Sequence, residues 1–174
     1  MARTPKYKAK AVYWDSRNRT VVNPVLVERY RIEGKLRLPN HIWRFDSTHE
    51  FKVYLELVRM YGERRIERQV SIKIIPKCTC YPNGKKWRVD FVITKSRVNK
   101  QIYCLVEAKG AFLPEFASVL VNLEKEDIEK FKRTFIVFPG KIPNKNLVVK
   151  ALLRSFFSKN LITLKDLRAL KELP

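Results

Sequence analysis

The chain has 174 residues, 45% of them hydrophobic, which is enough for a core that needs no disulfide or metal to hold it together. Its 37 lysines and arginines against 17 aspartates and glutamates leave a formal net charge of +20, a balance typical of proteins that bind a polyanion such as nucleic acid. No apolar run approaches the ~18 residues of a membrane span, and no lipidation or signal motif is recognisable. We therefore expect a soluble, cytoplasmic protein without a membrane partner.

The first 46 residues are basic and aromatic. We predict a hairpin over residues 10–25 that turns at residues 15–18, and a second extended piece at residues 35–38. Tyrosines and tryptophans alternate here with cations, as on surfaces that contact phosphates and stack on bases. For Tyr13 and Trp43, burial in the core is the favoured alternative. The candidate nucleic-acid-binding cations of this extension are Lys8, Lys10, Arg17, Arg19 and Arg44.

Residues 48–62 have the periodicity of an amphipathic helix. Ser47 and Glu50 have the spacing of a capping box, in which Ser47 caps the helix and Glu50 bonds back to the Ser47 amide. Glu50 also lies at the border of the apolar stripe, so it is the acid of this helix that could reach an interior site, whereas Glu56 points nearly opposite. The expected stripe consists of Phe51, Tyr54, Leu55 and Val58.

Alternating apolar runs after this helix predict three strands, and a helical region and a fourth strand follow them. Two further short helices are expected near the end, the second introduced by Thr163 with Asp166 three positions later. The strands are expected at residues 67–75, 87–94, 101–109 and 134–138, and the helices at residues 115–133, 146–159 and 164–172.

The second and third strands form the most informative hairpin. If the chain turns at Val98 and Asn99, Asp90 stands opposite Glu107 at a carbon separation of roughly 4.5–5.5 Å. Lys109 shares the face of Glu107 because strand side chains alternate. Two carboxylates suit a hard cation such as Mg²⁺, and a neighbouring lysine can orient water or stabilise charge on a phosphate. The alternative is a surface salt bridge across the hairpin.

The three cysteines and two histidines complete no familiar zinc pattern. Cys78, Cys80 and Cys104 are an odd number and lack Cys-x-x-Cys spacing, so we expect reduced thiols.

The order of helix, three strands, helix and strand, with Glu50, Gln69, Arg-Val-Asp90-Phe-Val and Val-Glu107-Ala-Lys109-Gly on it, resembles the PD-(D/E)XK nuclease superfamily. It is most similar to small phage-type endonucleases and to the endonuclease subunit of heteromeric transposases. The resemblance implies an α/β, restriction-endonuclease-like αβββαβ core over residues 47–140, with a mixed sheet flanked by helices. Residues 1–46 would then be a basic β extension and residues 141–174 a helical one. Val89 departs from the proline that often precedes the aspartate.

Carried over to this sequence, the resemblance implies that Asp90 and Glu107 bind Mg²⁺ or Mn²⁺ with the Ala108 carbonyl. Lys109 would orient the attacking water, and Glu50 would be an additional metal ligand, direct or through water. A glutamine beside such a site would hold a metal ligand or the scissile phosphate, which is the role implied for Gln69.

The function expected from these residues is that of a metal-dependent endonuclease that hydrolyses DNA. A junction-resolving nuclease of the same superfamily, acting on branched DNA, stays open, as does a non-catalytic DNA-binding protein with this fold. An RNA-binding module is a further alternative, but this sequence lacks the paired aromatic strand motif of common RNA-binding proteins. The apolar segment at residues 147–157 could be a core lid or the face of a homodimer.

Overall fold

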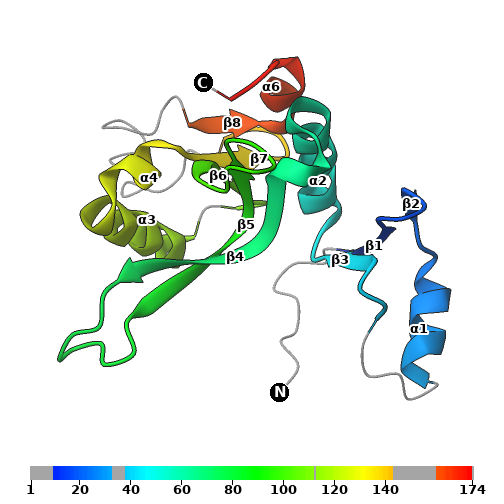
Figure 1. The fold of residues 1–174 in the computed structure, drawn as a ribbon, viewed down its shortest axis with the longest axis horizontal. Coiled ribbons are helices and arrows are strands. Elements are labelled where there is room, and N and C mark those ends of the chain that lie inside the picture. The colour runs from blue at the N-terminus through cyan, green and yellow to red at the C-terminus, as the bar shows by residue number, and fades with distance from the viewer. Residues whose placement is uncertain (1–9, 33–37, 112, 143–159, 174) are drawn as a thin grey trace. The chain divides into compact units, whose positions relative to one another are not determined.

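The computed structural model describes residues 10–32, 38–111, 113–142 and 160–173 (Figure 1). The chain divides into two compact units, Met1–Lys52 and Val53–Pro174, and the division falls inside helix α2 (Thr48–Tyr61). In the described part of the chain, no helix has the length and apolar character needed to cross a membrane.

The N-terminal unit contains a small antiparallel sheet with the strand order β2-β1-β3. The predicted hairpin is present, because Trp14 of β1 pairs with Val21 of β2. Its turn is capped by the Asp15 carboxylate, which accepts hydrogen bonds from the amides of Arg17 and Asn18 at 2.8 and 3.0 Å. The elements are β1 (Val12–Asp15), β2 (Thr20–Val21), α1 (Pro24–Ile32) and β3 (Ile42–Phe45).

Two elements of this unit were not predicted, namely α1 and β3. Helix α1 begins at Pro24, and the side chain of Asn23 accepts a hydrogen bond from the Val25 amide at 2.9 Å. This asparagine–proline start is a helix signal, but no continuous apolar stripe follows it. Of the extended piece expected at residues 35–38, residues 35–37 lie outside the described residues, and Leu38 is not in a strand.

Helix α2 follows its prediction closely at both ends. The Ser47 hydroxyl accepts a hydrogen bond from the Glu50 amide at 3.0 Å, as expected of a helix cap. The other half of the capping box was wrong, because the Glu50 carboxylate accepts from the amide of Asp46 at 2.8 Å. The apolar stripe also differs: Leu55 is 39% exposed, and the fully buried positions are Val53 and Leu57.

The C-terminal unit is a mixed α/β structure built on a five-stranded sheet in the order β4-β5-β6-β7-β8. Strands β4, β5 and β6 are antiparallel, and β6, β7 and β8 are parallel. The strands are β4 (Ile66–Ile75), β5 (Lys85–Thr94), β6 (Ile102–Ala108), β7 (Thr134–Phe138) and β8 (Leu161–Thr163). The helices, besides α2, are η1 (Glu63–Arg65), α3 (Pro114–Glu126), α4 (Ile128–Lys132) and α6 (Leu164–Ala169).

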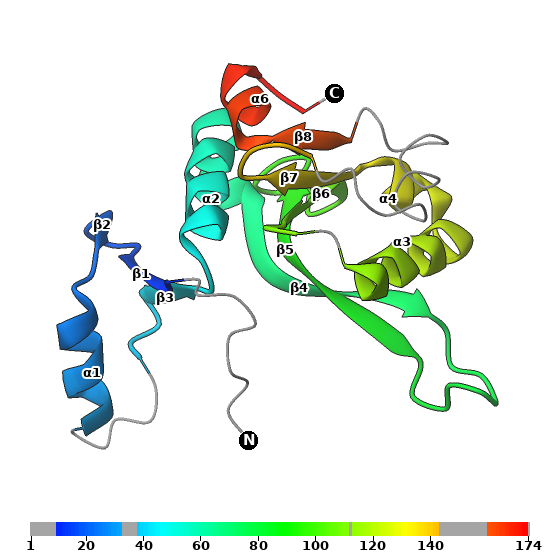
Figure 2. The same cartoon turned by 180° about the vertical axis from the view of Figure 1, so that it is seen from behind.

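Helices cover both faces of this sheet, as Figure 2 shows from behind. Phe91 of β5 stacks on Tyr54 of α2 with ring centroids 6.2 Å apart. The next residue, Val92, belongs to the core cluster that includes Leu120 and Leu123 of α3. Because neighbouring strand residues point to opposite faces, α2 and α3 lie on opposite sides of the sheet. The predicted mixed sheet flanked by helices is therefore confirmed.

The remaining differences lie toward the C-terminus. The helix expected at residues 115–133 is broken at Asp127, whose side chain accepts from the Lys130 amide at 2.9 Å and so caps a new helix, α4. Strand β8 was not predicted. Helix α6 begins with the expected Thr163–Asp166 capping box but ends at Ala169. The segment expected to be helical at residues 146–159, including the possible dimer face, lies outside the described residues.

Candidate active site

Near the acids, the β5–β6 hairpin has the predicted register, but the turn lies one residue earlier than predicted, at Arg97 and Val98, where the Ser96 amide donates to the Asn99 carbonyl at 3.1 Å. Phe91 pairs with Val106 and Val92 pairs with Leu105, whereas a bulge shifts the register at Thr94. Beyond the Phe91–Val106 pair the backbone ladder ends, and the next two residues are Asp90 and Glu107. The two carboxylates therefore lie where the strands stop pairing through their backbones.

Side chains replace the missing backbone bonds at this point. The Asp90 amide donates a hydrogen bond to Glu107 Oε2 at 3.0 Å, and the Ala108 amide donates one to Asp90 Oδ2 at 2.9 Å. Each carboxylate is thus bonded to the backbone of the opposite strand. This cross-bracing fixes both acids without requiring a long and mobile side chain.

Gln69 lies beside the acids on the neighbouring strand β4. Its side-chain Nε2 donates a hydrogen bond to Asp90 Oδ1 at 3.2 Å. Its backbone has a φ of 52°, a left-handed conformation that is uncommon for residues other than glycine. The β4–β5 ladder skips Gln69, since its register passes from Arg68 directly to Val70. A strained residue at this place is typical of a site where the fold positions a particular side chain.

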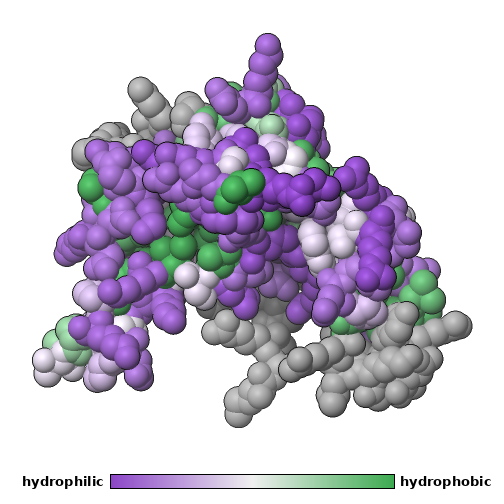
Figure 3. Space-filling model, viewed as in Figure 1, coloured by the Kyte–Doolittle hydropathy of each residue, from purple (hydrophilic) through white to green (hydrophobic). Residues whose placement is uncertain are grey.

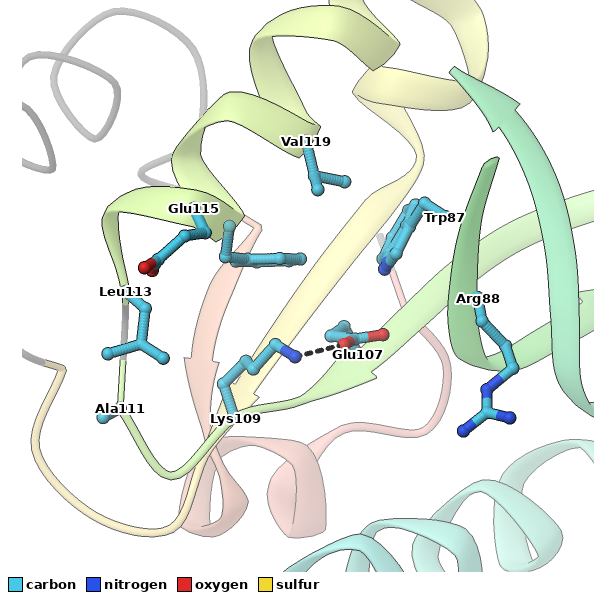
Figure 4. Close-up of a pocket in the computed structure, with 9 residues that line it drawn as sticks. Trp87, Arg88, Glu107, Lys109, Ala111, Leu113, Glu115 and Val119 are labelled. Carbon is cyan, nitrogen blue, oxygen red and sulfur yellow. Dashed lines mark ion pairs between the residues drawn. The ribbon is translucent and has the colours of Figure 1, made fainter. Parts of the chain in front are cut away.

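Glu107 is almost fully buried, with 2% of its surface exposed. Burial raises the pKa of Glu107 to about 8, and the negative charge of Asp90 adds to the shift, while Lys109 opposes it. Lys109 Nζ lies 2.5 Å from Glu107 Oε1, an ion pair marked in Figure 4. The same ammonium lies 4.7 Å from the centroid of the Phe116 ring, which is a cation–π contact.

Glu107 and Lys109 open onto a cavity of about 310 Å³ between the sheet and the start of α3 (Figure 4). On the face seen in Figure 3, apolar side chains gather between α3 and the β4–β5 hairpin, with hydrophilic side chains around them. Among the described residues, Asp90 is not part of the cavity lining. The lining consists of Trp87, Arg88, Glu107, Lys109, Ala111, Leu113, Glu115, Phe116 and Val119.

The donor set fits a hard cation only in part. In the part of the chain that the structure describes, no three His, Cys, Asp or Glu side chains gather as a metal site. Two carboxylates are sufficient for Mg²⁺, which keeps several waters. Each oxygen of Asp90 and Glu107 already has a partner, and a cation at Glu107 Oε1 would have to displace the ammonium of Lys109. The Ala108 amide bonds Asp90, as stated above, and its carbonyl remains a predicted ligand.

The other predicted site residues belong to the N-terminal unit. The carboxylate of Glu50 is buried and bonded to the Asp46 amide. Arg44 forms an ion pair with Asp46 at 3.3 Å. Lys10, Arg17, Arg19 and Arg44 are exposed, and Lys8 lies outside the described residues. The roles predicted for Glu50 and for these cations stay predictions.

Most residues of the cavity lining were not singled out from the sequence, among them Trp87, Arg88 and Phe116. Trp87 and Arg88 precede Asp90 on the same strand, so their nearness to the site could have been inferred from the strand. Phe116 carries no such signal, because only the packing of α3 against the sheet brings its ring to Lys109.

Comparisons of the chain with protein-family models, with curated proteins and with solved structures find no match. The function is therefore inferred from the chemistry of the site and from the charge of the chain.

Proposed function

We propose that this protein is a divalent-metal-dependent endonuclease that hydrolyses phosphodiester bonds in DNA, with a core like that of the restriction endonucleases. The observation that carries the proposal is the cross-braced pair Asp90 and Glu107, with Lys109 beside it, at the edge of a cavity. The net charge of +20 supports a polyanionic substrate.

Asp90, Glu107 and the Ala108 carbonyl would hold Mg²⁺ or Mn²⁺. When bound, such a cation lowers the pKa of a water molecule and stabilises charge on a phosphate. The protein's own residues prepare this chemistry: Gln69 orients Asp90 through its amide, and the Asp90 and Ala108 amides fix the two carboxylates.

Lys109 has two tasks in this scheme. Without a cation it offsets the charge of Glu107, with which it forms an ion pair. With a cation held by the two carboxylates, the ammonium would be free beside them. There it would orient the attacking water and stabilise charge on the phosphate.

The decisive experiment incubates the purified protein with supercoiled plasmid, linear duplex and a four-way junction, each with Mg²⁺, Mn²⁺ or EDTA. We expect cutting with the metals and none with EDTA. Asp90→Asn and Glu107→Gln should abolish cutting while leaving DNA binding intact or tighter, because a carboxylate that repels phosphate has gone. Preferential cutting of the junction would identify a junction-resolving nuclease.

Lys109→Met keeps the apolar stem over Phe116 and removes the charge. We expect it to lower the cleavage rate by about 10²–10⁴-fold, the usual contribution of a general acid or base. Glu129→Gln is the matched control for Glu107→Gln, since it also neutralises a glutamate. The Glu129 side chain is 63% exposed and pairs only with Lys132 among the described residues. Full activity of both Asp90→Asn and Glu107→Gln would contradict the proposal.

One observation favours a second candidate, a non-catalytic DNA-binding protein with this fold. Because all four carboxylate oxygens have partners within the protein, a cation would have to share these oxygens with the Gln69, Asp90 and Ala108 amides or displace the ammonium of Lys109. If the wild-type protein binds DNA but cuts none of the three substrates with either metal, this candidate is favoured.

A further inference from the structure

Strands β4 and β5 continue past the rest of the sheet as a two-stranded ribbon that ends in a loop at residues 76–84. Both views show this ribbon extending away from the body of the C-terminal unit (Figures 1 and 2). Its pairing is regular near the sheet, with Ile72 opposite Trp87 and Lys73 opposite Lys86, and a bulge follows before Ile75.

The two faces of the ribbon have opposite character. Ile72, Ile74 and Trp87 are buried on one face, where Trp87 meets Phe116 of α3 with ring centroids 5.8 Å apart. Lys73, Lys86 and Arg88 are exposed on the other face, which we call the cationic face. Residues 70–89 include five lysines and arginines and no aspartate or glutamate.

This distribution is unfavourable for the isolated protein. Lys73 lies directly opposite Lys86, and like charges at such a cross-strand position destabilise a sheet. Glu126 of α3 forms an ion pair with Lys73 at 3.5 Å, which offsets part of this repulsion. Over the described residues, no acidic side chain forms an ion pair with Lys77, Lys85, Lys86 or Arg88. The cationic face therefore lacks the anions that would balance it.

The loop at the end of the ribbon has a defined shape. The backbones of Cys78 and Tyr81 exchange hydrogen bonds of 3.1 and 3.0 Å, and the Gly84 amide donates to the Tyr81 carbonyl at 2.8 Å. Gly84 has a φ of 66°, and a Cβ there would lie 2.8 Å from the Ile75 carbonyl oxygen, so the turn requires glycine. The loop presents exposed Cys78, Cys80 and Tyr81.

We propose that the β4–β5 ribbon is a duplex-DNA-binding arm, whose cationic face lies along the phosphates while its loop enters a groove. The major groove of B-form DNA, about 12 Å wide, admits a two-stranded β-ribbon. The major groove of A-form RNA is too narrow and deep for side chains to read, so DNA is the better fit. Lys86 and Arg88, two residues apart on one face, are spaced by roughly 6.8 Å, the rise of two base pairs.

The arm and the candidate active site share strand β5. Arg88 of the cationic face is two residues from Asp90 and borders the cavity that holds Glu107 and Lys109, but its side chain points away from these two residues (Figure 4). The arm and the cavity are therefore neighbours along one strand, on different faces of the ribbon. The inference rests on the proposed function for the claim that this DNA is cut, but the binding itself needs neither metal nor turnover.

The first test measures duplex binding by the full chain in EDTA over a range of salt concentrations. The arm variant Lys73→Gln/Lys86→Gln/Arg88→Gln is compared with the control variant Lys95→Gln/Lys165→Gln/Lys171→Gln. All six side chains are exposed, and both variants lose three positive charges. Three lost phosphate contacts should reduce the slope of log affinity against log salt by about 2.7, and the control should keep the wild-type slope. Equal losses in the two variants would overturn the proposal.

The second test leaves the charges unchanged. A photoactivated cross-linker is attached to Cys80 in a Cys78→Ser variant, where the buried Cys104 does not compete for the reagent. We expect cross-linking to duplex DNA that unlabelled duplex DNA suppresses at least tenfold better than duplex RNA does. An absent cross-link, or equal suppression by RNA, would contradict a DNA arm.

The two proposals can fail separately. Loss of binding in the arm variant together with no metal-dependent cutting would reject the nuclease and keep the arm. Cutting that depends on Asp90 and Glu107, with unchanged binding in the arm variant, would keep the nuclease and reject the arm.

Discussion

At the scale of single residues, the candidate site depends on two acids that are held by backbone amides. Asp90 and Glu107 accept these hydrogen bonds where the β5–β6 ladder ends. Burial of Glu107 beside another carboxylate disfavours its charged form. The protein therefore keeps a group whose charge destabilises its own fold, as is usual where acids are gathered for chemistry.

This cost predicts a dependence of stability on pH. The pKa of Glu107 is about 8 in the folded protein, above its ordinary value of 4.5, so the folded state binds the proton more tightly than the unfolded state. The stabilisation is complete below about pH 4.5 and is lost as the pH rises to about 8. We expect the metal-free protein to lose unfolding free energy over this interval, measured by urea denaturation, and Glu107→Gln to lose less.

The control for this measurement is Glu129→Gln, which removes an exposed acid. It should reproduce the pH profile of the wild type. Parallel profiles of stability against pH for the wild type and Glu107→Gln would show that Glu107 has the same pKa in the folded and unfolded states.

At the scale of secondary-structure elements, one residue interrupts the regular backbone conformation of β4. Gln69 adopts a left-handed backbone in the middle of a ten-residue strand, and its amide thereby reaches Asp90. Helix α2 shows a second local arrangement, in which the Ser47 hydroxyl accepts from the Glu50 amide and the Glu50 carboxylate accepts from the Asp46 amide. Both arrangements have a structural and a functional interpretation, which substitutions can separate.

For Gln69, the effect of the backbone strain on stability is separated from that of the side-chain amide by comparing Gln69→Gly with Gln69→Ala. Both substitutions remove the amide, but only alanine keeps the left-handed strain, so Gln69→Gly should be more stable than Gln69→Ala by about 1 kcal/mol in thermal or urea unfolding. At Ser71, an exposed position in the regular part of the strand, the order should be reversed, because glycine weakens a strand by about 0.5–1 kcal/mol. If the glycine and alanine variants had the same order of stability at both positions, backbone strain at Gln69 would be refuted.

For Glu50, the comparison is between the cap and the proposed catalytic role. Glutamine still offers an oxygen to the Asp46 amide, so Glu50→Gln should melt within a few degrees of the wild type and, if the acid takes part in catalysis, fail to cut. Glu56→Gln is the control on the same helix, since Glu56 pairs with Arg59 and Arg168 at 3.0 and 3.2 Å. Normal cutting by Glu50→Gln would leave Glu50 as a helix cap only.

At the scale of the whole molecule, the charge of +20 determines how the protein meets its partner. Neutralised phosphates release counterions, so affinity for non-cognate duplex should fall by about 10³–10⁵-fold between 50 and 200 mM salt if about 6–10 phosphates are contacted. Filter binding or fluorescence anisotropy in EDTA measures this fall. A nearly flat dependence would mean that the charge serves another partner, such as an acidic protein.

The N-terminal cations make a separate contribution to this charge. Neutralising Lys8, Lys10, Arg17 and Arg19 together should weaken binding to all DNA sequences alike if they form a non-specific clamp. Selective loss at one sequence would instead mean that these residues read bases.

The sequence by itself determined the elements that depend on local patterns. The bounds of α2 and β7 and the Thr163–Asp166 cap follow from side-chain periodicity and from nearby capping residues, which act within a few positions. The opposition of Asp90 and Glu107 was also predicted, but its register results from a turn one residue earlier than predicted and a bulge at Thr94 that compensates for it.

Only the tertiary structure decided what depends on residues far apart in the chain. The contact of Lys109 with Phe116, the burial that shifts Glu107 and the addition of β8 to the sheet all arise from packing between distant segments. The left-handed backbone of Gln69 is of the same kind, because nothing in its neighbours requires it. Local patterns carry no information on such contacts, since their free energy exists only once the sheet and α3 have come together.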